Sequence, residues 1–171
     1  MPNQPDVAAA SAQQQAAAKD LLLRTEAATA PYTDLARARA AGYDLQASLT
    51  RAERKKPGLA AALRRADAST SPAMAGPMRM LHVGNTANRV DGKVLDPSAP
   101  ETLMYGYEGH WMLMGVMYVA GESYPQAPPD PGGPITRWHY HDKSGGQGLM
   151  MHIFFVPGND LGHAYAADLN A

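Results

Sequence analysis

The sequence predicts an α+β protein in which N-terminal helices precede a mainly antiparallel, β-rich domain that forms a small barrel or sandwich. Segments rich in alanine, glutamine and leucine fill residues 1–68. Aromatic and β-branched runs separated by Gly and Pro begin at residue 72 and reach the C-terminus. All six histidines and nine of the ten methionines follow residue 68. We therefore expect a helical extension over 1–68 and the chemistry in a domain over 72–171.

The N-terminal segment contains signals for four helices. Asp6 is the expected N-cap of the first, and Pro31 is expected to end it. Thr33 or Asp34 is expected to cap the second, with Gly42 at the position after its end. The expected ranges are 7–29, about 35–41, 45–55 and about 59–68.

The first of these helices is expected to be an extension rather than a part of the site. Its alanine- and glutamine-rich stretch, 8–18, is poorly anchored alone, so it either frays or docks, and a second subunit or assembly partner is one place to dock. It contains no histidine. Removal of residues 1–29 is therefore expected to leave the site intact.

The second segment contains strand signals after a Ser/Thr/Pro linker at 69–72. A hairpin is expected around Asp91-Gly92, and a tight reversal at Gly109-His110. A loop with five prolines over 124–134 is expected to be irregular. The expected strands are 78–83, 88–90, 93–95, 103–107, 111–120, 135–141 and 149–156.

Composition excludes several classes of protein. The net charge of −1 leaves no electrostatic footprint for nucleic acid. No apolar run is long enough to span a bilayer, and no signal peptide is visible. The absence of cysteine excludes disulfides, thiolate zinc sites and iron–sulfur clusters.

The most informative stretch is Trp138-His139-Tyr140-His141. Residues two apart in a strand point to the same face, so both imidazoles can converge on one ion. If His141 pairs with Met150 in a hairpin, then His139 pairs with His152, and all four side chains share a face. We therefore expect His139, His141 and His152 to hold one divalent transition metal.

A fourth ligand is expected from His82, in a short apolar strand. Imidazoles alone suit zinc or copper, and added thioether leans toward copper. His110 and His163 are interpreted as loop residues, and no carboxylate is spaced for an iron site. The methionines of the strands are interpreted as core packing, with Met117 on the opposite face from Met112 and Met114; they are Met112, Met114, Met117, Met150 and Met151.

Two resemblances follow from these residues. The spacing from Gly133 to His139 and His141 resembles the first metal motif of the cupins, which implies a small β-barrel, although Gly145 and Gly146 stand where cupins have a glutamate. The chain also resembles uncharacterised exported bacterial proteins, which implies a periplasmic or extracellular location. The segments that carry this second resemblance are 31–34, 40–43, 95–97, 100–105, 138–141 and 151–154.

Three functions remain open on the sequence. The first is a metal-binding protein of the cell envelope or exterior that handles zinc or copper. The second is a cupin-like metalloenzyme that acts on a small molecule. The third is a structural or assembly subunit that docks through its N-terminal helix.

Overall fold

The protein is an α+β fold of helices and one antiparallel sheet, which confirms the expected fold class. The structure, a computed structural model, describes residues 4–65, 80–120, 128–139 and 149–167. Within them the elements are α1 (Ala12–Thr29), η1 (Ala30–Thr33), α2 (Leu35–Ala40), α3 (Leu45–Lys55), α4 (Leu59–Arg65), β1 (Leu81–Gly84), η4 (Asn88–Val90), β2 (Thr102–Tyr107), β3 (Trp111–Ala120), β4 (Leu149–Phe154), η5 (Pro157–Asn159) and α5 (Leu161–Ala164). None of the described helices is long and apolar enough to cross a membrane.

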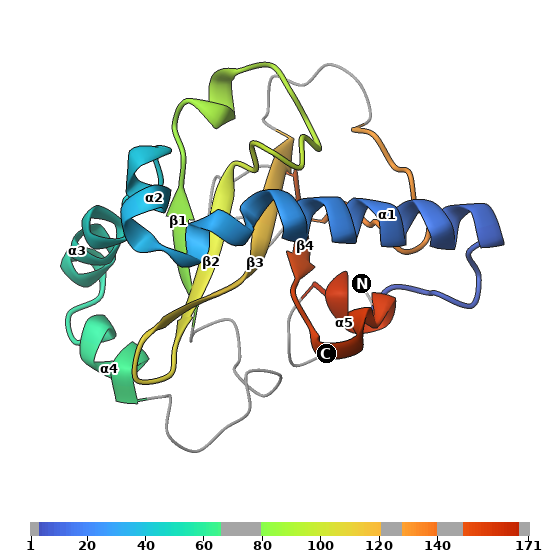
Figure 1. The fold of residues 1–171 in the computed structure, drawn as a ribbon. Coiled ribbons are helices and arrows are strands. Elements are labelled where there is room, and N and C mark those ends of the chain that lie inside the picture. Colours follow the sequence, from blue (N-terminus) through green and yellow to red (C-terminus); the bar gives the residue numbers. More distant parts are fainter. Residues whose placement is uncertain (1–3, 66–79, 121–127, 140–148, 168–171) are drawn as a thin grey trace.

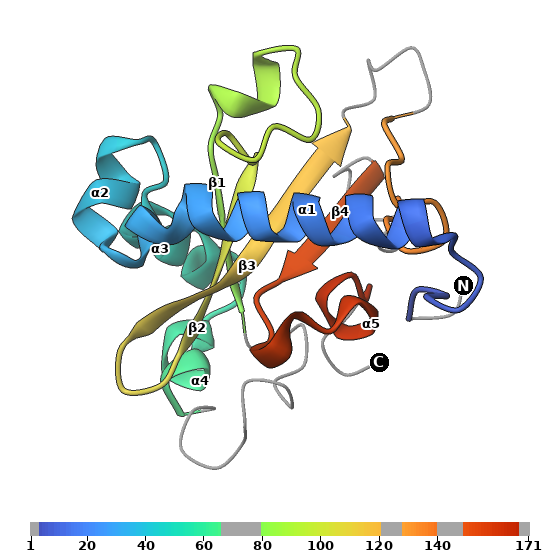
Figure 2. The same ribbon diagram turned by 45° about the vertical axis from the view of Figure 1, so that its right-hand side comes forward.

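The sheet is open, with strand order β1-β2-β3-β4 and antiparallel neighbours throughout. The expected barrel or sandwich does not form in the described part of the chain, because a helix and not a second sheet covers one face (Figures 1 and 2). The expected hairpin around Asp91 is also wrong. The side chain of Asn85 accepts a hydrogen bond from the backbone N–H of Ala87, and the chain continues into the turn of η4.

Helix α1 begins later than the sequence indicated. Ser11 is its N-cap, and its hydroxyl accepts from the Gln14 N–H while the Gln14 side chain accepts from the Ser11 N–H. This reciprocal capping box satisfies two backbone donors at once, and it fixes the start at residue 12. Asp6 instead accepts from the Ala9 N–H in a preceding turn. Asp6 is therefore not the cap of this helix.

The shorter helices follow the sequence closely. Asp34 accepts from two backbone N–H groups as the N-cap of α2, and Gly42 follows that helix with φ +99°. Such a positive φ favours glycine, as expected for the residue after a helix end. Helix α3 has the predicted bounds, with Asp44 as its N-cap. Helix α4 ends at Arg65, and the last residues of its predicted range lie outside the described part of the chain.

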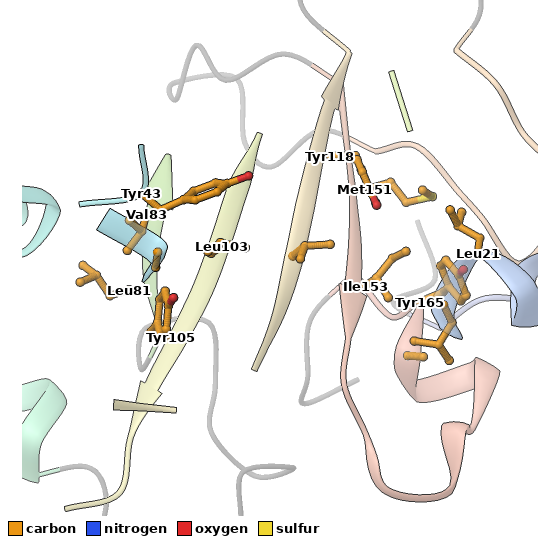
Figure 3. Packing of buried hydrophobic residues seen from close by; sticks show 14 of the residues in the cluster. Leu21, Tyr43, Leu81, Val83, Leu103, Tyr105, Tyr118, Met151, Ile153 and Tyr165 are labelled. Atoms are coloured by element: carbon orange, nitrogen blue, oxygen red, sulfur yellow. The ribbon is translucent and has the colours of Figure 1, made fainter. Parts of the chain in front are cut away.

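One face of the sheet carries the main core, which the N-terminal helices share (Figure 3). Several hydrogen bonds join the two halves of the sequence across it. Thr25 Oγ1 lies 2.8 Å from the Tyr118 hydroxyl, and Tyr165 donates to the Ala18 carbonyl oxygen at 2.7 Å. The Tyr43 hydroxyl donates to the Pro100 carbonyl oxygen at 2.6 Å. Helix α1 is therefore a structural cover of its own sheet (Figures 1 and 2).

The segment 128–139 is a loop that reaches the sheet at its end. The strand expected over 135–141 is wrong over 135–138, because the Thr136 hydroxyl donates to Asp130 at 2.6 Å and accepts from the Gly132 N–H. The Trp138 indole N–H also donates back to the Pro129 carbonyl oxygen. These bonds hold the segment in turns. His139 alone among residues 135–139 forms a β-bridge, and the rest of the predicted strand lies outside the described residues.

Candidate metal centre

Two of the predicted ligands lie on the face of the sheet that α1 does not cover. Alternation along β1 places Leu81 and Val83 in the main core and His82 on the opposite face. Alternation along β4 does the same for His152, between Met151 and Ile153 of the main core. A second buried cluster covers this face, and it consists of Met80, Met104, Met117, Val119, Met150 and Phe154.

The third predicted ligand, His139, reaches the same face through its bridge to β4. Its backbone N–H donates to the Met150 carbonyl oxygen at 2.8 Å, and its carbonyl oxygen accepts from the Met150 N–H at 2.9 Å. The predicted register, with His139 opposite His152, is therefore wrong by two residues. A shift of two residues is one full side-chain period, so His139 stays on the face of His152 and lies diagonally from it.

The His152 ring lies close to the rings of both His139 and His82, and these three residues are called the histidine row. The ring centres of His139 and His152 are 5.1 Å apart, and those of His82 and His152 are 6.2 Å apart. An imidazole nitrogen lies about 2.0–2.1 Å from zinc, which places two rings at the tetrahedral angle about 5.2 Å apart. The first pair matches that separation, and the second requires a wider angle at the ion.

Hydrogen bonds orient the two more buried rings. His152 is 5% exposed and its Nδ1 lies 2.9 Å from the Ala167 carbonyl oxygen, while His139 is 8% exposed with Nδ1 3.4 Å from the Arg137 carbonyl oxygen. A carbonyl oxygen can only accept, so Nδ1 of His152 carries the proton in that contact. In that tautomer Nε2 is the unprotonated nitrogen, which is the form in which a histidine binds a metal.

The described residues alone do not form a three-ligand centre of the usual donor types. Among the described residues, no three His, Asp or Glu side chains are placed to hold one ion together. His141, the remaining predicted ligand, lies outside the described residues. The pairs around His152 therefore need a further donor to complete a metal site.

The other two histidines lie apart from this row. His110 is exposed in the predicted reversal between β2 and β3. His163 is exposed on α5, and its Nδ1 lies 3.2 Å from the Asp160 carboxylate. These two side chains therefore provide matched controls for any histidine variant of the site.

The methionine arrangement differs from the expectation in one respect. The pairing of β2 with β3 runs from Met104–Gly115 to Tyr105–Leu113 and so leaves out Met114. This bulge breaks the alternation, and Met114 packs against the same cluster as Met117. A β-carbon at Gly115 would lie 2.3 Å from the Ile153 carbonyl oxygen, which explains why glycine stands at the bulge.

Glu101 is a buried acidic residue that the sequence reasoning did not assign to the site. Its side chain is 3% exposed, and its Oε2 accepts from the Val119 N–H at 3.0 Å. Burial raises the pKa of Glu101 to about 7. Val119 pairs with Met150, and Met150 forms the bridge to His139. The Glu101 carboxylate therefore binds the backbone of β3, the strand that pairs with β4 of the histidine row. In the sequence Glu101 stands between Pro100 and a strand, and this pattern does not indicate that its side chain is buried.

Comparison of the chain with protein-family models, with curated proteins and with solved structures gives no match. The function is therefore argued from the geometry and chemistry of the histidine row.

Proposed function

We propose that the protein binds one transition-metal ion through His139 and His152, with His82 and His141 as further ligands. The observation that carries the proposal is the row of imidazoles on one face of the sheet, with its closest pair at 5.1 Å. Its members come from three separate segments: β1, β4 and the loop that ends at His139. Zinc and copper are the ions whose ligand preferences fit imidazole best.

The surroundings of the row favour a ligand over simple packing. Imidazole is a side chain that binds transition metals, and two of them lie side by side here, buried against methionine and phenylalanine. His152 also contacts the Phe154 ring, with ring centres 5.4 Å apart. An ion bound by these imidazoles would stabilise the folded state by its free energy of binding.

The role proposed for this ion is metal handling rather than catalysis. A catalytic metal needs an open position and a nearby acid or base. The buried carboxyl of Glu101 is engaged with the Val119 backbone and supports the strand pairing. We therefore propose capture of zinc or copper as the function, and the resemblance to exported bacterial proteins is the ground for proposing that it takes place in the cell envelope or exterior.

Metal content of purified protein tests the proposal. The protein is incubated with zinc or copper, desalted, and analysed by mass spectrometry of the metal. We expect about one ion per chain in the wild type, and the same in a double variant His110→Ala, His163→Ala. The double variant His139→Ala, His152→Ala should retain almost none.

A second measurement separates loss of ligands from loss of fold. Metal should raise the melting temperature of the wild type and of the control, because a ligand that binds only the native state stabilises it. It should leave the melting temperature of the His139→Ala, His152→Ala variant unchanged. A folded wild type that binds neither metal, or a double variant that keeps its ion, would overturn the proposal.

A further inference from the structure

Each histidine of the row is the direct cross-strand partner of a buried methionine. His82 on β1 pairs with Met104 on β2, and His152 on β4 pairs with Met117 on β3. His139 pairs with Met150 through its isolated bridge. Directly opposite residues of an antiparallel pair share a face, so each of the three imidazoles lies opposite a thioether on the same face.

These methionines are among the most buried residues of the protein. Met104, Met117 and Met150 are 0%, 1% and 2% exposed. All three belong to the buried cluster on the face opposite α1. Their sulfur atoms are therefore confined to the layer of the sheet that carries the imidazoles.

Thioether sulfur is a soft ligand that discriminates between metals. It binds monovalent copper well and contributes little to zinc, for which imidazole, thiolate and carboxylate are the usual ligands. The described residues do not bring three His, Asp or Glu side chains together on one ion. A methionine beside the His139–His152 pair would supply a third donor without any rearrangement of the strand pairing.

We infer that the ion held by this row is Cu(I), and that at least one of the cross-strand methionines Met104, Met117 and Met150 is a ligand to it. The inference rests on the proposed function and narrows it to one oxidation state of one metal. The ion arrives already as Cu(I), so no electron transfer is part of the binding step.

Methionine also fills gaps in apolar cores, and the cluster serves that purpose as well. The strand pairing distinguishes methionines that lie opposite a histidine from methionines that only pack in a core. Met151, next in sequence to Met150 and 1% exposed, points into the main core beside Ile153 and has Tyr118 as its partner. Met151 is therefore a matched control for burial without a histidine partner.

The first test compares Leu substitutions at these positions. Leucine keeps the volume and apolar character of methionine, so the fold should survive. The triple variant Met104→Leu, Met117→Leu, Met150→Leu is compared with Met151→Leu and with the wild type. Cu(I) affinity is measured anaerobically by competition with a chromophoric Cu(I) chelator, and Zn²⁺ affinity by competition with a zinc chelator.

We expect the triple variant to lose Cu(I) affinity by tenfold or more, with Zn²⁺ affinity changed less than about twofold, since a direct ligand should matter at least as much as the roughly 10–100-fold of an outer partner. Met151→Leu should match the wild type for both ions. If the triple variant keeps wild-type Cu(I) affinity, the methionines are packing residues and the inference fails while metal binding stands. If the wild type binds neither ion, both proposals fail.

X-ray absorption of the Cu(I)-loaded wild type gives an answer that does not depend on how the variants fold. The chain contains no cysteine, so sulfur in the first coordination shell, in thiol-free buffer, must come from methionine. The inference predicts at least one Cu–S scatterer together with imidazole scattering. A first shell of nitrogen alone would overturn it.

Discussion

His139 and Met150 exchange both of their backbone hydrogen bonds, at 2.8 and 2.9 Å, in a single bridge at the end of a loop. That bridge places the His139 ring 5.1 Å from the ring of His152. The loop before it is held by turns and the strand beside it by the sheet, so the histidine pair joins an irregular segment to a regular one. The candidate site therefore depends on the sheet, and the sheet depends on its helical cover.

The helical cover gives the first prediction. Leu22 of α1 is fully buried against the sheet, whereas its neighbour Leu23 is 42% exposed. Leu22→Ala should lower the free energy of unfolding by about 2–5 kcal/mol, through lost apolar burial and the cavity that remains. Leu23→Ala should change it by less than about 0.5 kcal/mol. Urea unfolding of both variants checks this, and equal effects would mean that α1 does not pack as described.

The same contacts revise the expectation for a truncated protein. Residues 1–29 contain Ala18, Leu22 and Thr25, which are all completely buried. Thr25 is hydrogen-bonded to β3, and Ala18 is hydrogen-bonded to the residue that follows α5. Their removal would expose the main core of the sheet, so the truncated chain should lose both fold and metal binding. This reverses the expectation from the sequence, which treated the first helix as dispensable because it contains no histidine.

The helices were predicted well because their signals are local in the sequence. The sheet depends on contacts between distant segments and was predicted only in part. Asp34 and Asp44 mark helix starts through contacts within three residues, so the sequence alone is sufficient. The start at Ser11 was missed because its cap depends on the reciprocal bond with Gln14, and Asp6 offered a competing signal. The aromatic and β-branched residues of 111–120 predict a strand, and β3 has those bounds.

The sequence predicted which residues form the candidate site, but not how these residues are arranged. His139 and His152 share a face in the predicted register, and they still do after a shift by two residues, whereas a shift by one would separate them. Their register depends on the loop that precedes His139, where the Thr136–Asp130 bond replaces the expected strand. The cross-strand methionines could not be found from sequence, because their partners are set by the pairing of distant strands.

Glu101 gives a prediction on pH. Burial raises its pKa to about 7 in the folded protein, from the ordinary value of 4.5. Between these two pH values the folded protein keeps a proton on Glu101 that the unfolded chain releases. The contribution of Glu101 to the free energy of unfolding is therefore greatest below pH 4.5, falls as pH rises, and levels off above pH 7. The contribution of this residue should amount to roughly 3 kcal/mol.

The variant Glu101→Gln isolates this effect. The amide oxygen of glutamine can still accept from the Val119 N–H, and it does not titrate. The difference in unfolding free energy between wild type and variant, measured in urea from pH 4.5 to 7.5, should therefore move against the wild type as pH rises. Titration of the histidines affects both proteins and cancels in the difference. A difference that is constant over this range would contradict the assignment.

His82 decides whether the site is closed. Its ring lies 6.2 Å from that of His152, so it reaches an ion only at a wider angle than His139 does. We expect His82→Ala to lower metal affinity by an order of magnitude or more, as loss of a direct ligand should. His110→Ala, at an exposed turn, is the control. Unchanged affinity, together with azide binding to the wild-type metal, would show an open position instead.

The most direct test of the central claim is an NMR titration of the six imidazole rings with zinc, followed through their ring nitrogens. The account predicts that Nε2 of His139 and of His152 shifts to a metal-bound value, while Nδ1 of His152 stays protonated against the Ala167 carbonyl oxygen. The rings of His110 and His163 should not change. Saturation of the protein with zinc while the rings of His139 and His152 stay unperturbed would contradict it.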